Sequence, residues 1–263
     1  TEAVRQIDQS HLVGVHTILA ASEVVKERLR HFNGLDANVG VYHAGTGLTE
    51  ELVVGAGPST FDHVLCVSRH EFPKRTELFV HALAYLPETQ GVLVGAGGRL
   101  PWIRTLHARL ARRGINLDEI SDEDLWLCTA PPIPSPKPPD RSNLRLLDHV
   151  GEADLAHFYN TAACVVAPAY LEDYGLTAIE AMSWGKPLVV CKDGGGLVSF
   201  VEDGVNGFVV EPRGTAIADA VRRLTDDPAL AREMGEHGRE MARRFTWERG
   251  LEEVAAGLDA VAG

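Results

Sequence analysis

The chain has 263 residues, of which 45% are apolar and 24% are charged, and this composition is typical of a folded globular protein. The length is enough for one full α/β domain plus an additional piece. A formal net charge of −12 argues against nonspecific nucleic-acid binding and against a strongly basic membrane-docking face. No apolar run approaches the ~20 residues that cross a bilayer, and the first residues lack the pattern of a signal peptide.

The first sixty residues predict a small amount of secondary structure that cannot bury a core alone. The sequence VHTILAAS indicates a buried strand, Ser22 is a typical helix N-cap before EVVKERLRHF, and Gly34 is a typical C-cap. The sequence ANVGVYHAG predicts a second strand, followed by a Gly- and Thr-rich linker in which we place His43. Two strands and one helix must pack on the rest of the chain or on a further domain.

From Phe61 onward, strand-like and helix-like runs alternate. The strand-like runs are apolar throughout, which indicates a parallel sheet covered by helices on both faces. We therefore predict an α/β fold with a doubly wound, Rossmann-like parallel sheet, whose ligand lies beyond the carboxyl ends of the strands. The predicted strands are HVLCVS, GVLVGAG, LRLLDHV, ACVVAPAY, PLVVCKD and GFVVEP. The helix WERGLEEVAAGLDAV ends the pattern.

The cysteines, histidines and prolines indicate the cellular compartment and a surface loop, and they form no catalytic or metal-binding motif. Three of the four cysteines lie in predicted buried strands and none forms a CxxC pair, so we expect free thiols in a reducing, cytoplasmic setting. The eleven histidines show no metal-binding spacing. Six prolines between Pro131 and Pro139 predict an extended surface loop, near a site rim or, alternatively, a ligand for a proline-recognising partner.

The segment from Pro168 to Val190 carries the most chemistry. A predicted strand ends at Pro168, the polar loop LEDYG follows, and a helix begins near Leu176 with free N–H groups that suit a phosphate. Glu172 lies in the loop and Glu180 lies within the helix, where its neighbours are apolar. A carboxylate there needs a partner, either a ribose diol or a structural arginine. The combination of an anion seat and two carboxylates points to a sugar nucleotide.

A second cluster follows the strand HVLCVS. Arg69 and Lys74 bracket a turn that contains Pro73, and a helix follows. Two cations at the carboxyl end of a strand can neutralise a diphosphate and a departing negative charge. The competing interpretation is that Arg69, Lys74 and Arg75 form a solvated basic turn.

Two glycine-rich turns end other predicted strands. The turn in residues 91–98 fails the GxGxxG pattern because Leu100 stands at the third glycine position. We read it as a tight turn that lets backbone approach a ligand. Gly194, Gly195 and Gly196 predict another close-approach or phosphate-facing turn, or a flexible loop.

With these motifs in order, the chain resembles the donor-binding half of retaining, family 4 (group 1) glycosyltransferases of the GT-B fold. SRHEFPKRTELFVHAL is similar to the family's Gly-Arg…Lys-Gly helix entry, and EDYGLTAIEAMSWGKPLVV to its Glu-x(7)-Glu signature. GVLVGAGG and DGGGLVSF are similar to its glycine turns. The resemblance runs from about Val15 to the C-terminus. The chain departs from the pattern at Ser68, Asp148 and Ser199.

The resemblance implies a role for each candidate residue. Arg69 and Lys74 would hold the diphosphate of a nucleoside-diphosphate sugar and stabilise the leaving group. Glu172 would contact the transferred sugar, and Glu180 would bind the ribose. The base would lie near His149 and Val150, and the helix N-terminus would supply backbone contacts from Gly175, Leu176 and Thr177. Transfer to a sugar, lipid or small-molecule acceptor would retain the anomeric configuration and need no bound metal.

The resemblance also predicts the domain organisation. We assign residues 1–58 to the remnant of an N-terminal acceptor domain and linker, 59–245 to the donor-binding domain, and 246–263 to a C-terminal helix. The missing acceptor domain or a partner chain would complete the cleft. The alternatives are a noncatalytic nucleotide-sugar-binding module, a subunit of a split enzyme and a sugar-nucleotide epimerase.

Overall fold

The computed structural model describes residues 2–12, 14–35, 39–46, 60–110, 117, 120–122, 125 and 142–262. The Pro-rich segment 131–139, Cys128 and the boundary at residues 58 and 59 lie outside the described residues. Our expectations for them stay predictions.

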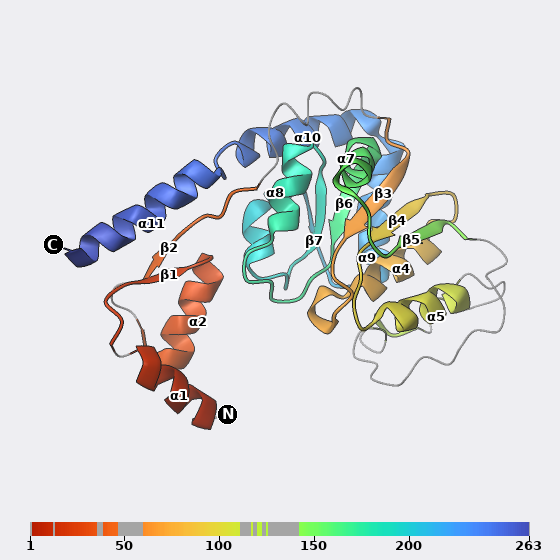
Figure 1. Ribbon diagram of the computed structural model, residues 1–263. Helices are drawn as coiled ribbons and strands as arrows, with labels where there is room; N and C mark the ends of the chain where they lie inside the picture. The colour runs from red at the N-terminus through yellow and green to blue at the C-terminus, as the bar shows by residue number, and fades with distance from the viewer. Residues whose placement is uncertain are drawn as a thin grey trace.

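Six parallel strands form the central sheet, in the order β5–β4–β3–β6–β7–β8 (Figure 1). The strands are β3 (His63–Val67), β4 (Gly91–Val94), β5 (Leu144–Leu147), β6 (Ala162–Ala167), β7 (Leu188–Cys191) and β8 (Gly207–Val210). The chain winds outward from β3 to β5, then returns to β6 and winds the other way. The strand order therefore reverses between β3 and β6, and the predicted doubly wound sheet is confirmed.

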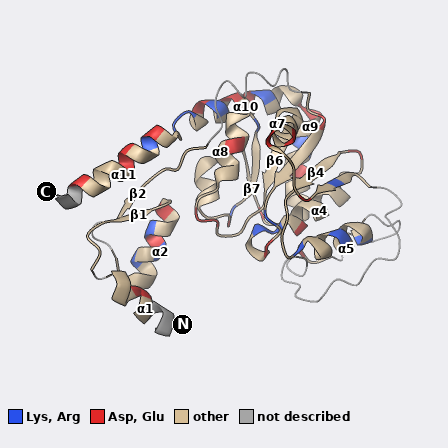
Figure 2. Cartoon of the chain, viewed as in Figure 1, with Lys and Arg blue, Asp and Glu red and all other residues tan. Residues whose placement is uncertain are grey.

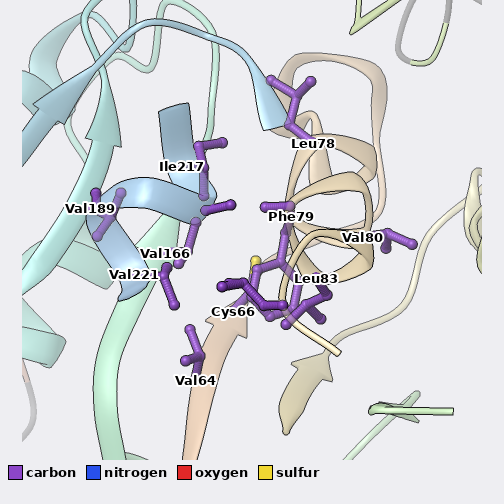
Figure 3. Close-up of a cluster of buried hydrophobic side chains, with 14 of the residues drawn as sticks. Val64, Cys66, Leu78, Phe79, Val80, Leu83, Val166, Val189, Ile217 and Val221 are labelled. Carbon is purple, nitrogen blue, oxygen red and sulfur yellow. The ribbon is translucent and has the colours of Figure 1, made fainter. Parts of the chain in front are cut away.

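Helices cover both faces of the sheet because its central strands are buried throughout. One face packs α4 (Thr76–Ala84), α5 (Leu100–Leu110) and α9 (Gly214–Asp226) over residues such as Cys66 and Val189 (Figure 3). The other packs α7 (Glu152–Thr161) and α8 (Leu176–Ser183). Helix α10 (Pro228–Ala242) contacts both α8 and α9. Strands β6 and β7 carry no Lys, Arg, Asp or Glu (Figure 2).

The N-terminal residues form a separate β–α–β unit. Strands β1 (Ile18–Ala20) and β2 (Val39–Val41) pair in parallel outside the main sheet, and α2 (Glu23–Asn33) connects them. Ser22 caps α2 by accepting a hydrogen bond from the Val25 N–H, and Gly34 ends it with φ 69°, as predicted. Helix α1 (Glu2–Leu12) precedes this unit and was not predicted. Helix α11 (Trp247–Ala262) projects from the main sheet and contacts β1 (Figure 1).

The described cysteines are structural. Cys66, Cys164 and Cys191 are free and buried within strands, and burial raises the pKa of the Cys164 and Cys191 thiols to about 12. Thiols with such pKa values are poor nucleophiles at neutral pH. Within the described part of the chain, no helix combines the length and the apolar composition that crossing a membrane requires.

A buried histidine at the start of β3 gives the first prediction. His63 is 8% exposed and lies edge-on to Phe158. Burial lowers its pKa from 6.5 to about 4, although the Asp62 carboxylate acts in the opposite direction. Between these two pKa values the unfolded chain binds a proton at His63 and the folded chain does not. The free energy of unfolding therefore falls as the pH falls. The loss from His63 should be about 2 to 3 kcal/mol at pH 4.5.

His63→Gln removes this titration. In urea unfolding at pH 7 and pH 4.5, we expect the variant to lose less stability than the wild type by that amount. His237→Gln changes an exposed histidine and should follow the wild type. Equal losses in His63→Gln and the wild type would refute a buried neutral imidazole.

Candidate functional site

The candidate site is a cavity of about 380 Å³ at the carboxyl ends of β3 and β6, where the strand order reverses. Val67 and Ser68 line it from the end of β3, and Ala167 lines it from the end of β6. Tyr42 and Ala44, which follow β2, also contribute to the lining. The cavity therefore lies between the six-stranded sheet and the N-terminal unit.

Lys74 reaches the cavity from a tight turn after β3. Residues Phe72–Lys74 form one turn of 3₁₀ helix, and Arg75 adopts a left-handed conformation, φ 46°, before α4 begins. The Tyr170 N–H donates to the Pro73 carbonyl at 2.7 Å, which fixes this turn against the loop that follows β6. Two segments about a hundred residues apart in the sequence are thus held together at the site.

The buried side chain of Arg75 also connects the turn after β3 to the loop after β6. Its side chain is 1% exposed and donates to the Pro168 carbonyl at 2.9 Å and to the Ala169 carbonyl at 3.1 Å. Its guanidinium also forms a two-pronged ion pair with Asp193, with N–O distances of 2.6 and 2.9 Å. The competing interpretation of Arg69, Lys74 and Arg75 as a solvated basic turn is therefore wrong for Arg75, which is a buried structural cation.

Lys74 and Glu172 form an ion pair inside the cavity. Their side chains are 19% and 23% exposed, so the pair is screened by water less than a surface pair would be. The structure thus pairs Lys74, which we predict to bind phosphate, with Glu172, which we predict to bind the sugar. Neither residue forms part of a solvated basic turn.

Helix α8 begins at the cavity wall. Gly175 precedes it with φ 107°, a conformation that favours glycine, and a Cβ at this position would lie 2.8 Å from a Leu197 methyl group. Gly175, Leu176 and Thr177 all line the cavity, so the unpaired N–H groups of the first turn lie at its wall. The predicted helix start is confirmed.

Glu180 lies one turn further along α8 and does not line this cavity. Its carboxylate accepts a hydrogen bond of 2.8 Å from the hydroxyl of Tyr159, which is buried on α7. Burial raises the pKa of Glu180, while the Tyr159 hydrogen bond opposes that rise. The competing explanation, a structural arginine partner, is wrong: the partner within the described residues is a tyrosine. The sequence offered no signal for this pairing beyond the apolar surroundings of Glu180.

Three predicted residues lie on the same edge of the sheet but outside the cavity lining. Arg69 is exposed just beyond β3. His149 is exposed and Val150 is half-buried, and both follow β5. Strand β5 is two strands away from β3, roughly 10 Å across the sheet. The nearby Asp148 forms an exposed ion pair with Arg104.

Four glycines in the two glycine-rich turns lie close to protein backbone. A Cβ at Gly95 would lie 1.9 Å from the Ser68 carbonyl oxygen, and one at Gly97 would lie 2.4 Å from that of His70. Gly195 and Gly196 pack in the same way against the backbone of Glu172 and Asp173. These four glycines therefore let neighbouring loops at the site pack closely together, and the expectation that the turns also approach a ligand stays a prediction.

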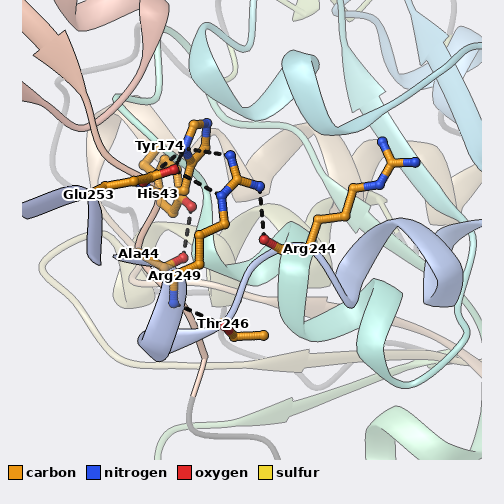
Figure 4. A network of polar contacts seen from close by, with 7 residues as sticks. All are labelled: His43, Ala44, Tyr174, Arg244, Thr246, Arg249 and Glu253. Carbon is orange, nitrogen blue, oxygen red and sulfur yellow. Dashed lines mark hydrogen bonds and ion pairs between the residues drawn. The ribbon is translucent and has the colours of Figure 1, made fainter. Parts of the chain in front are cut away.

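A polar network joins the site to the C-terminal helix (Figure 4). Glu253 on α11 accepts from the His43 N–H at 2.7 Å and from Arg249 at 2.9 Å. Burial acts to raise the pKa of Glu253, but these hydrogen bonds outweigh it and lower that pKa. Tyr174, in the loop of Glu172, donates its hydroxyl to the Ala44 carbonyl at 2.7 Å. His43 and Ala44, in the segment that we read as a linker, are therefore held by α11 and by the loop of Glu172.

The structure is a doubly wound domain with a cavity at its topological switch point, lined by Lys74, Glu172 and the first turn of α8. Residues 141–241 match the family model described as glycosyl transferases group 1. The chain therefore contains a group 1 glycosyltransferase domain.

Relatives and solved structures agree with this assignment. The chain is 27% identical to a D-inositol 3-phosphate glycosyltransferase of Streptomyces bingchenggensis, over 94% of this chain and 53% of that protein. It is 32% identical to the protein of the same name from Kribbella flavida, over 69% of this chain and 39% of that protein. The chain thus spans about half or less of the length of these curated relatives.

Among solved structures, sucrose-phosphate synthase from Thermosynechococcus elongatus has a TM-score of 0.74 at 23% identity, covering all of this chain and 62% of that one. HepE of Anabaena, in complex with UDP and glucose, has a TM-score of 0.75 at 19% identity, covering 99% of this chain and 68% of that one. These similarities establish the GT-B type of fold.

Proposed function

We propose that this chain forms the donor side of a retaining glycosyltransferase that uses a nucleoside-diphosphate sugar. The observation that carries the proposal is the meeting of Lys74, Glu172 and the N-terminus of α8 in one cavity. The cation and the free N–H groups suit the diphosphate. The adjacent carboxylate suits the hydroxyls of the sugar. Crystallisation of HepE with UDP and glucose supports testing a uridine nucleotide first.

The remaining roles are those that the resemblance to the family implies. Arg69, exposed on the same edge, would reach the diphosphate from outside the cavity. Glu180 would hold the ribose, and the base would lie toward His149 and Val150. In the reaction the bond between the anomeric carbon and the diphosphate oxygen breaks, and the acceptor oxygen bonds to the same face of that carbon. The acceptor proton passes to the leaving diphosphate, whose charge Lys74, Arg69 and the helix terminus stabilise without a metal.

Two partners belong to the proposal. The acceptor is a sugar, a lipid or a small molecule, and the names of the relatives make D-inositol 3-phosphate the first to test. The second partner is the acceptor-binding part of the cleft, supplied by an N-terminal domain or another chain. The alternative, a noncatalytic binding module or split-enzyme subunit, predicts the same donor binding without transfer by this chain. Assays of sugar transfer with and without the upstream domain of a relative separate the two.

Binding is the direct test. In thermal shift and calorimetry with UDP, GDP, ADP and TDP, we expect one diphosphate to raise the melting temperature well above the effect of its nucleoside. Ligand at 100 times its Kd stabilises the folded state by about 2.7 kcal/mol. If no diphosphate exceeds its nucleoside, the proposal is wrong.

Glu180→Gln tests the ribose assignment. The wild type should prefer a ribonucleoside diphosphate over its 2′-deoxy form, and the variant should lose that preference by roughly tenfold, because a charge-assisted hydrogen bond is lost. Burial raises the pKa of Glu180, so its carboxylate becomes protonated at a higher pH than a free glutamate does. As the pH is lowered, the preference for the ribonucleotide should therefore be lost earlier than a free glutamate would predict. Glu236→Gln, an exposed change on α10, is the control. An unchanged preference in Glu180→Gln would make Glu180 a structural partner of Tyr159.

A further inference from the structure

The loop that carries Glu172 is held on one side by the turn after β7. The Leu171 N–H donates to the Asp193 carbonyl at 2.9 Å, and the Glu172 N–H donates to the Gly194 carbonyl at 3.0 Å. The Gly196 N–H returns a hydrogen bond to the Glu172 carbonyl at 2.7 Å. These contacts lie within the donor domain, so they persist whatever the N-terminal unit does.

Helix α2 of the N-terminal unit holds the other side of the loop. One guanidinium nitrogen of Arg28 pairs with the Asp173 carboxylate, and the other donates to the Leu171 carbonyl at 2.9 Å. The guanidinium therefore spans Glu172 and grips the residues before and after it. The Ser22 hydroxyl adds a hydrogen bond to the Asp173 carbonyl.

The backbone of this loop needs such support. Leu171 has φ 47°, a left-handed conformation that is unfavourable for a residue with a Cβ. Its carbonyl is one of the two groups that Arg28 holds. Because Arg28 is 33% exposed and comes from outside the six-stranded sheet, its grip depends on how closely α2 approaches the donor domain.

We propose that Arg28 is a positioning residue that sets the Glu172 carboxylate for the sugar, so that sugar recognition depends on a contact from the N-terminal unit. The inference rests on the proposed function. It separates two parts of one site. Among the described residues, Lys74 and the first turn of α8 form no hydrogen bond or ion pair with the Arg28 side chain, whereas both neighbours of Glu172 do. Arg28 should therefore affect the sugar and leave the diphosphate alone.

The test measures Kd for the diphosphate selected by the binding panel and for its glucose, N-acetylglucosamine and mannose conjugates. For Arg28→Ala we expect the diphosphate Kd to stay within about twofold and the Kd of the preferred conjugate to rise about 5- to 20-fold, on the scale of one charge-assisted contact. Arg30→Ala is the matched control on the same helix, where Arg30 pairs with Glu27. It should change neither Kd.

A double variant distinguishes positioning from a general loss of structure. If Arg28 acts through Glu172, Arg28→Ala should have little further effect on the conjugate in a Glu172→Gln background. Additive losses, or an equal loss for the diphosphate and its conjugate, overturn this inference and leave the proposed function standing. The inference is also overturned if the wild type binds none of the three sugar conjugates more tightly than the diphosphate alone. Failure of the wild type to bind any diphosphate overturns the proposed function and the inference together.

Discussion

Arg75→Ala should destabilise the folded chain by about 3 kcal/mol, the largest stability effect that we expect from a single residue near the site. The change removes the partner of the Asp193 carboxylate and leaves the Pro168 and Ala169 carbonyls without their donor. Removing one member of a buried ion pair is costly because the other charge is left uncompensated. Breaking a buried ion pair costs roughly 3–5 kcal/mol. Asp193 is 29% exposed, so we take the lower end of this range for Arg75→Ala.

Urea unfolding measures this loss. Arg75→Lys keeps the charge but cannot reproduce the forked contact, so it should fall between Ala and the wild type. Arg222→Ala removes an exposed pair with Asp219 and should cost less than about 0.5 kcal/mol. If Arg75→Ala unfolds within 0.5 kcal/mol of the wild type, the buried pair does not stabilise this fold.

Arg75 also shows where inference from the sequence ends. The order of strands and helices follows from local patterns, because buried parallel strands are apolar throughout and the covering helices are amphipathic. The caps at Ser22 and Gly34 and the start of α8 after Gly175 were predictable for the same local reason. The partner of a charged side chain is not a local property. Arg75 reaches Asp193 across 118 positions, and no spacing rule links them.

Some features of the candidate site were likewise predictable from the sequence, and others were not. The gathering of Lys74, Glu172 and Gly175 follows from topology, since β3 and β6 end at the same edge of a doubly wound sheet. The hydrogen bond of Glu180 to Tyr159 and the grip of Arg28 on the Glu172 loop depend on tertiary contacts between helices and loops. The backbone of Arg75 was not predictable either, because its φ of 46° lies in the left-handed region that favours glycine.

Lys74→Ala should weaken binding of the selected nucleoside diphosphate by about 10- to 100-fold and leave the nucleoside almost unchanged. A hydrogen bond to a charged group contributes about 1.5–3 kcal/mol, which corresponds to this range of affinity. The change also leaves the Glu172 carboxylate unpaired beside the seat, where it repels the incoming diphosphate. Lys74→Ala combined with Glu172→Gln should therefore recover part of the lost diphosphate affinity.

Calorimetry with the diphosphate and its nucleoside, at fixed ionic strength, separates these contributions. Lys192→Ala is the matched control, because Lys192 is an exposed lysine just beyond β7 that pairs with Glu211. Lys192 lies on the same edge of the sheet as Lys74. The Lys192→Ala variant should bind both ligands as the wild type does. Equal losses for the diphosphate and the nucleoside in Lys74→Ala would mean that Lys74 shapes the cavity rather than holding phosphate. Recovery in the double variant would instead show that part of the loss in Lys74→Ala comes from repulsion between the unpaired Glu172 carboxylate and the diphosphate, so that Lys74 acts both by holding phosphate and by neutralising Glu172.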